Sequence, residues 1–132
     1  MSAPHSVGRI DIALRSKVLD HCTQSVTKTS VEMRPFPHFV VTGFLPPDVY
    51  SDMLAGLPDP QQYEPFGYEK HHDKSGISNR YRFQLSNECL EKLPARQRDL
   101  WFTVRSVLGS VELKRTVFQK LAMSRSLLNA AG

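Results

Sequence analysis

The residues whose side chains are best suited to metal binding or catalysis lie in the most polar stretch of the chain, 69–79. This stretch contains His71, His72 and Asp73, whose imidazole and carboxylate groups are of the types that bind divalent metal ions. His72 is the last histidine of the sequence, so the second half of the chain offers no further imidazole ligand. Two ligands in a polar loop hold a metal weakly. We therefore favour a solvated loop over a metal site formed by His71 and Asp73.

Five other residues have side chains of types that are used in binding or catalysis in other proteins. Arg80 and Arg82 alternate with apolar residues and are predicted on the polar face of a strand, where they could grip a carboxylate or phosphate or simply be solvated. Cys22 and Cys89 are far apart and lack CxxC spacing, which predicts neither a zinc site, a disulfide scaffold nor a nucleophile. His38 lies in an apolar run, which favours a hydrogen-bonded structural histidine over a ligand.

The composition indicates a single small domain. The chain has 132 residues, of which 40% are hydrophobic, enough for a modest core. Its net charge of +4 is mildly basic, but no run of Lys and Arg interleaved with aromatic residues favours nucleic-acid binding. No stretch approaches the roughly 20 apolar residues of a membrane span, and the start of the chain lacks the pattern of a signal peptide. We expect a cytoplasmic protein without membrane contact.

Hydrophobic periodicity predicts an α+β fold that is mostly helical, with two or three short strands. Residues 1–9 are predicted to be a disordered N-terminus, 10–122 a single α+β domain, and 123–132 an irregular C-terminal tail. Within the domain we expect a helix from residue 10 to about 22, a linker at 23–29, strands at about 30–34, 38–44 and 80–85, and helices at about 46–56, 86–93, 94–108 and 111–122. These strands are too few and too scattered to close a barrel.

The stretch 35–54 organises the rest of the chain. Two prolines lead into an apolar run, and Pro46 and Pro47 then begin a helix, because the fixed φ of proline suits a first helical turn. Residues at helical spacing predict one apolar face for this helix: Val49, Tyr50, Met53, Leu54 and Leu57. We expect the helix at 94–108 to pack its apolar stripe against this face and against the strand at 80–85.

Three segments together carry a resemblance to a known family. They are PFPHFVVTGFLPPDVYSDML at 35–54, EPFGYEKHHDKSGISNRYRFQL at 64–85 and LPARQRDLWFTVRSVLGSVELKRTVFQKL at 93–121. They resemble the N-terminal region of bacterial 2-oxoglutarate- and Fe(II)-dependent oxygenases of the prolyl-hydroxylase-like superfamily. The resemblance implies the helical opening part of a double-stranded β-helix oxygenase, truncated before its jelly-roll core.

The same resemblance implies a chemistry for the parent protein. Two histidines and one carboxylate would hold Fe(II), leaving open positions for 2-oxoglutarate and dioxygen, and a basic residue would pair with the far carboxylate of 2-oxoglutarate. The reaction would be hydroxylation coupled to oxidative decarboxylation of 2-oxoglutarate to succinate. This chain departs from the family because no histidine follows His72, and because its His-x-Asp at 71 and 73 precedes the helices. We expect it to bind neither Fe(II) nor 2-oxoglutarate and to have no turnover.

Three further hypotheses remain open. In the first, the polar loop at 69–79 lies over the mouth of the iron site in a full-length relative. The side chains of Tyr68, His71, Asn79, Arg80 and Arg82 would then face substrate. Alternatively the chain is a small protein-interaction module without catalysis, and it could form a homo-oligomer through apolar surface that a jelly roll would otherwise cover. A weak nucleic-acid binder is the third hypothesis, because Lys and Arg are in excess after Lys92.

Overall fold

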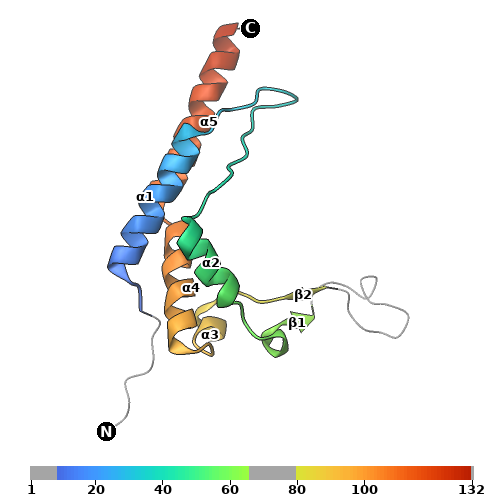
Figure 1. Ribbon diagram of the computed structural model, residues 1–132. Coiled ribbons are helices and arrows are strands. Elements are labelled where there is room, and N and C mark those ends of the chain that lie inside the picture. Colours follow the sequence, from blue (N-terminus) through green and yellow to red (C-terminus); the bar gives the residue numbers. More distant parts are fainter. Residues whose placement is uncertain (1–8, 66–79, 132) are drawn as a thin grey trace, which may run out of the picture.

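The computed structural model describes residues 9–65 and 80–131, with side chains described as far as Met123. The described elements confirm a mostly helical α+β chain with a small antiparallel sheet (Figure 1). They are, in chain order, α1 (Ile12–Lys28), α2 (Pro47–Ala55), the 3-10 turn η1 (Pro60–Gln62), β1 (Glu64–Pro65), β2 (Tyr81–Arg82), α3 (Asn87–Leu90), α4 (Ala95–Leu108) and α5 (Val111–Ala131).

Helix α1 begins at a side-chain cap and buries one apolar row. The Asp11 carboxylate accepts a hydrogen bond from the backbone N–H of Leu14 at 3.0 Å, which satisfies a donor that has no partner within the helix. Val18, Cys22 and Val26 follow at spacings of four residues and are all buried. The helix therefore has an apolar row that extends well beyond the predicted end near residue 22.

The predicted linker at 23–29 is wrong, because this segment continues α1 to Lys28. Its Ser and Thr residues form hydrogen bonds with the preceding turn of the helix. The hydroxyl of Ser25 donates to the carbonyl oxygen of His21 at 2.7 Å, and that of Thr27 donates to Thr23 at 2.8 Å. Such hydroxyls usually favour caps and turns, but here they are satisfied within the helix while Val26 anchors it to the core.

Helix α5 also runs further than predicted. Ser110 caps it, because the Ser110 hydroxyl oxygen accepts from the Leu113 N–H at 3.2 Å. The helix then continues to Ala131, so the predicted irregular tail at 123–132 is wrong for its helical part. Apolar periodicity fades there, but the segment contains Met, Leu, Ala and Arg, which favour helices, and no Pro or Gly before residue 132. Of the predicted disordered segment 1–9, residues 1–8 lie outside the described residues.

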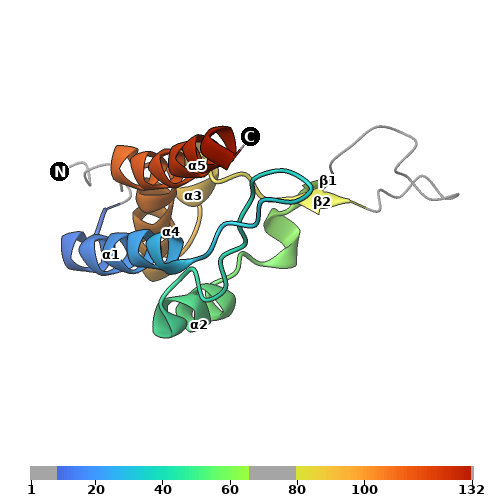
Figure 2. The same ribbon diagram turned by 90° about the horizontal axis from the view of Figure 1, so that it is seen from above.

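The main core lies between four helices, α1, α2, α4 and α5. Helix α1 lies beside α5 and runs in the same direction, and it also packs against α4 (Figures 1 and 2). Helices α2 and α3 each pack against α4. The predicted contact between α4 and α2 is thus confirmed, and α4 packs more extensively against α1 than against α2. The buried residues of this core are Val18, Cys22, Val26, Val49, Val104, Val107 and Leu113.

The chain between α1 and α2 is extended and returns along the helices to the start of α2 (Figure 1). Within it the Glu32 N–H donates to the His38 carbonyl oxygen at 2.7 Å, and the His38 N–H donates to Glu32 at 2.9 Å. The strands predicted at 30–34 and 38–44 are therefore reduced to this one bridge among the described residues. Their β-branched and aromatic residues favour a strand, but the described two-stranded sheet lies elsewhere and supplies no partner.

The described sheet is a short hairpin on a second, smaller core. β1 pairs with β2 in antiparallel register, with Glu64 opposite Arg82 and Pro65 opposite Tyr81. The strand predicted at 80–85 is thus only two residues long. After it, Phe83 packs on the small core of buried residues, which are Leu90, Leu93 and Phe102.

Candidate functional site

The predicted metal and substrate residues fall mostly on one segment. Tyr68, His71, Asp73 and Asn79 lie outside the described residues, so their placement stays a prediction. What the structure describes is the base of that segment, where β1 and β2 pair side by side and bring the chain at Pro65 next to the chain after 79. The hairpin thus positions both ends of the segment at one edge of the second core.

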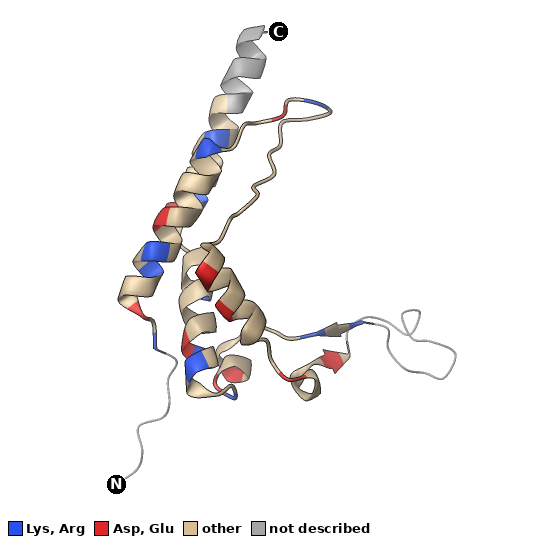
Figure 3. Cartoon of the chain, viewed as in Figure 1, with Lys and Arg blue, Asp and Glu red and all other residues tan. Residues whose placement is uncertain are grey.

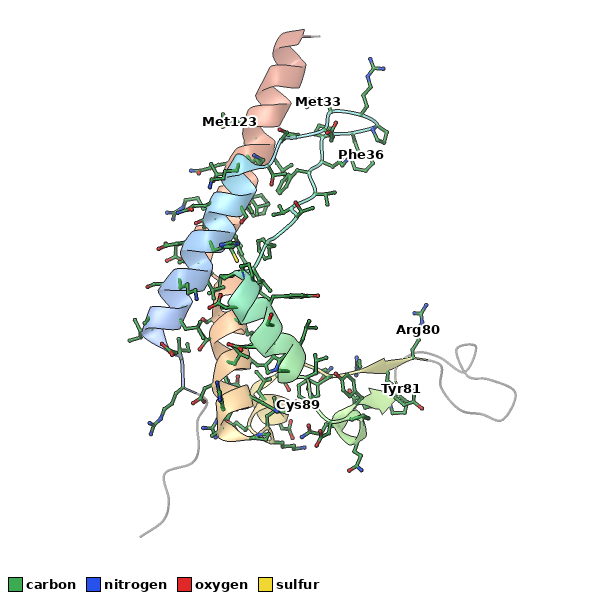
Figure 4. All side chains as sticks on the ribbon, in the orientation of Figure 1. Met33, Phe36, Arg80, Tyr81, Cys89 and Met123 are labelled. Atoms are coloured by element: carbon green, nitrogen blue, oxygen red, sulfur yellow. The ribbon has the colours of Figure 1, made fainter. Side chains whose placement is uncertain are left out.

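The two predicted arginines lie at this hairpin. Arg82 donates from Nε to the Glu64 carboxylate at 2.8 Å, an exposed ion pair across the two strands. Arg80 is exposed at the start of the hairpin, and Figure 4 shows it leaving the strand on the opposite side from Tyr81. Arg82 is therefore engaged with a carboxylate of its own chain.

The described residues do not fit an iron site of the family that the sequence resembles. Among the residues that the structure describes, no group of three or more His, Cys, Asp and Glu side chains is arranged to hold a metal ion. His21 donates from Nε2 to the carbonyl oxygen of Gly43 at 2.8 Å, and His38 donates from Nδ1 to Phe36 at 2.7 Å. Both described histidines thus have structural partners, which confirms the expectation for His38.

Cys22 is a structural thiol. Its Sγ lies 3.3 Å from the carbonyl oxygen of Phe44, and its side chain is buried between α1 and the extended segment. Desolvation raises the pKa of the Cys22 thiol to about 11. The thiol is therefore protonated at neutral pH, which makes it a poor nucleophile, as the sequence predicts.

Two hollows lie between the helices. The first, of about 520 Å³, is lined in part by the carboxylates of Asp11, Asp52 and Asp99. Asp11 caps α1, and Asp99 accepts from the backbone N–H of Arg9 at 3.1 Å. At least two of the three acids thus hold the chain together, and an acidic cluster of this kind does not define a ligand site.

The second hollow, of about 530 Å³, lies where α1 ends and the extended segment passes α5. Met33 and Met123, both labelled in Figure 4, contribute to its apolar lining. Lys120 lies at its edge and donates from Nζ to the carbonyl oxygen of Thr27 at 3.1 Å. The lysine therefore caps the carbonyl end of α1.

The apolar face predicted for α2 is split into two rows by the structure. Val49 is buried, and Met53 packs against the same core. Tyr50, Leu54 and Leu57, which are spaced by four and three residues, are 53%, 52% and 48% exposed. Helix α2 is therefore apolar on its outer side as well as its inner side, and Leu57 extends this surface just past the end of the helix. We call these three residues the outer row.

The run 38–42 has the side-chain pattern of a strand. Phe39 and Val41 pack against the main core, whereas Val40 is 75% exposed and Thr42 is also exposed. Within the described part of the chain, the backbone groups of residues 39–42 form no hydrogen bond. The run therefore presents an open strand edge, which sequence analysis missed because it predicted the strand without asking what would pair with it.

The basic charge is not gathered into one described surface. Lys and Arg are spread over several elements with Asp and Glu between them (Figure 3). The Arg98 side chain donates to Asp99 at 3.1 Å, and Arg105 donates to the carbonyl oxygen of Leu85 at 2.8 Å. Several of the basic residues after Lys92 thus have partners inside the chain, which weakens the argument for a nucleic-acid surface.

No protein-family model, curated protein or solved structure matches the chain. None of the described helices has the length and apolar character that crossing a membrane requires.

Proposed function

We propose that this chain is the helical support region of a 2-oxoglutarate/Fe(II) oxygenase-like protein, and that its function is to bind a β-sheet that carries the catalytic residues. The observation that carries the proposal is the open edge at 38–42. Its side chains alternate as in a strand, its backbone lacks a partner in the described chain, and the resemblance at 35–54 assigns a strand to the same run.

The physical argument starts from the backbone. A protein surface that covers Phe39 to Thr42 must satisfy their N–H and C=O groups, because a buried backbone group without a partner costs about 1–3 kcal/mol. A β-strand supplies such partners in register. Phe39 and Val41 already fix the inner side of the run on the helices, so a sheet adds to it without refolding of the main core.

The outer row of α2 supports the same function. Helix α2 and the extended segment are joined directly at Pro46, and the hairpin projects from the same side of the molecule (Figure 1). An apolar row of this kind is typical of surface that another layer of structure covers. In this proposal, a sheet bound at 38–42 rests on this apolar row as well.

The chain by itself is proposed to be inactive. The residues for Fe(II) and 2-oxoglutarate would belong to the sheet, and this chain would contribute only the segment around His71 near the mouth of the site. Anaerobic calorimetry with Mn(II), with and without 2-oxoglutarate, tests this point. We expect no binding that tightens with 2-oxoglutarate, and micromolar binding that is abolished by H71A or D73A would contradict it.

Complementation in trans tests the supporting function. The partner is the jelly-roll core of an oxygenase whose own opening segment has the Pro-Phe-Pro-His-Phe pattern and has been deleted. We expect the wild-type chain and V40T to restore succinate formation from 2-oxoglutarate, and V41P to fail with unchanged helix content, because proline removes the Val41 backbone donor that faces the open edge. Equal activity with and without the chain would overturn the proposal.

An interaction module without any oxygenase ancestry is the second candidate, and the outer row of α2 favours it. A partner with an apolar groove could cover Tyr50, Leu54 and Leu57 without pairing with 38–42. L54S would then abolish binding of that partner, whereas V41P would leave it unchanged. The response to V41P separates the two functions, because V41P is expected to abolish support of a β-sheet.

A further inference from the structure

We infer that two copies of this chain pair through the open edge at 38–42, in an antiparallel arrangement centred on Val40. The inference needs only the open edge and does not depend on the oxygenase proposal. In the absence of a bound β-sheet, the occupant of the edge is a second copy, because the run is uncharged, carries an exposed apolar residue at its centre and matches a second copy in length.

The boundaries of the run fix the register. Pro37 lacks a backbone donor on one side, and Gly43 has a φ of 63° on the other, so neither continues a regular strand. Between them lie five residues, and Val40 is the central one. A twofold axis at Val40 therefore places Phe39 opposite Val41 of the second copy, and the regular pairing ends at Thr42, where the chain bends.

The hydrogen bonds between Glu32 and His38 determine which side of the run 38–42 is available to a second copy. Both backbone groups of His38 point toward Glu32 and are bonded there. In an extended chain the groups of the next residue point the opposite way, so Phe39 and Val41 present theirs on the side away from Glu32. A second copy on that side exchanges about four hydrogen bonds, two for each pair of Phe39 with Val41.

The side chains favour the same pairing. Val40 then lies opposite Val40 of the second copy in a pair without hydrogen bonds, where Cα atoms approach to about 4.5 Å and side chains are closest. Val40 is 75% exposed in the single chain, so the pairing buries apolar surface that is otherwise in water.

The absence of charged residues around the run 38–42 also allows two copies to pair there. From Pro35 to Pro47 the sequence has no Lys, Arg, Asp or Glu, so two copies meet without repulsion between like charges at this edge. Proteins commonly protect open edges with a lysine or a proline inside the strand. The run 38–42 has neither.

Sedimentation equilibrium of the whole chain tests the pairing. We expect the mass of the wild-type chain to rise from monomer to dimer with concentration in the micromolar range, and V40T to behave in the same way. V40K places two like charges opposite each other, so we expect its dissociation constant to rise at least tenfold. Because residue 40 is exposed, circular dichroism should show unchanged helix content. A wild-type monomer at all concentrations, or a V40K dimer of unchanged affinity, would overturn the inference.

Disulfide formation tests the register in a C89S background. We expect V40C to form a disulfide between copies under mild oxidation, because the Cα separation of about 4.5 Å lies within the range of disulfides. T42C is the matched control. Thr42 faces His38 of the second copy, which leaves the two Thr42 Cα atoms roughly 13 Å apart. We expect no T42C disulfide, and equal yields from both variants would contradict the register.

Discussion

The indole of Trp101 donates its Nε1–H to the carbonyl oxygen of Gly56 at 2.9 Å, and this bond ties α4 to the C-terminal end of α2. Gly56 is buried there, and a Cβ at this position would lie 3.1 Å from the carbonyl oxygen of Asp52 and 3.4 Å from Cγ of Gln97. Trp101 also packs on the small core of Leu90, Leu93 and Phe102. Trp101 lies on the helix that the sequence predicts at 94–108, and its indole N–H additionally positions α2.

Trp101→Phe tests that bond. We expect the free energy of unfolding to fall by about 1–2 kcal/mol, because the Gly56 carbonyl loses its donor while most of the aromatic packing is kept. Urea denaturation measures the change. Tyr50→Phe is the control, since the Tyr50 ring is exposed on the outer side of α2 and should change stability by less than about 0.5 kcal/mol. Equal losses for both variants would show that the bond contributes nothing.

Cys22 gives the stability a defined dependence on pH. The pKa of its thiol is about 11 in the folded chain because of desolvation, and about 8.5 when unfolded. As the pH rises, the thiol of the unfolded chain therefore loses its proton before that of the folded chain. The contribution of Cys22 to the free energy of unfolding is fully present below about pH 8.5 and is lost as the pH rises toward 11. We expect the difference in stability between wild type and Cys22→Ala, measured in urea, to shrink from pH 8 to pH 10.5. A constant difference would be inconsistent with this assignment.

The ion pair of Lys17 with Asp48 links α1 to the first turn of α2. The hydrogen bond from Lys17 lowers the pKa of the Asp48 carboxyl, even though the group is exposed. The stabilisation that this ion pair gives the folded chain is fully present above the pKa that Asp48 has in the unfolded chain. It is lost as the pH falls through the pKa that Asp48 has in the folded chain. In an NMR titration of the carboxyl carbons, we expect Lys17→Gln to raise the pKa of Asp48 toward its ordinary value. An unchanged titration in the variant would argue that the pair does not persist in solution.

Capping residues, prolines and glycines allow the ends of α2, α3 and α4 to be predicted from the sequence. Pro46 and Pro47 begin α2, and the Ser86 side chain caps α3 by accepting from the Cys89 N–H at 3.2 Å. Gly109 and Ser110 separate α4 from α5. Each signal acts within one turn of helix, so the sequence alone is enough to place it.

The errors arise where tertiary context decides. Ser and Thr at 23–29 read as a linker, but the burial of Val26 between helices outweighs their preference for turns. The run 38–44 has the residues of a strand, but a strand also requires a neighbour, and the described chain offers only the bridge at His38. The candidate ligands His71 and Asp73 stay a prediction, since they lie outside the described residues.

The two rows of α2 give the sharpest contrast between stability and binding. Val49 is 1% exposed and Leu54 is 52% exposed, although they lie on the same short helix. We expect Val49→Ala to lower the free energy of unfolding by about 1–3 kcal/mol, because it leaves a cavity in the main core. Leu54→Ser should change stability by less than about 0.5 kcal/mol.

For binding of a β-sheet, measured in the complementation assay, we expect Leu54→Ser to have the larger effect and Val49→Ala the smaller one. Leu54→Ser removes apolar surface on which the sheet rests, so succinate formation should fall severalfold although the chain remains folded. Val49→Ala, assayed well below its unfolding midpoint, should retain most of the activity because Val49 faces inward. If Leu54→Ser were instead as active as wild type, the outer row would not contact the sheet, and the strand edge at 38–42 alone would have to account for binding.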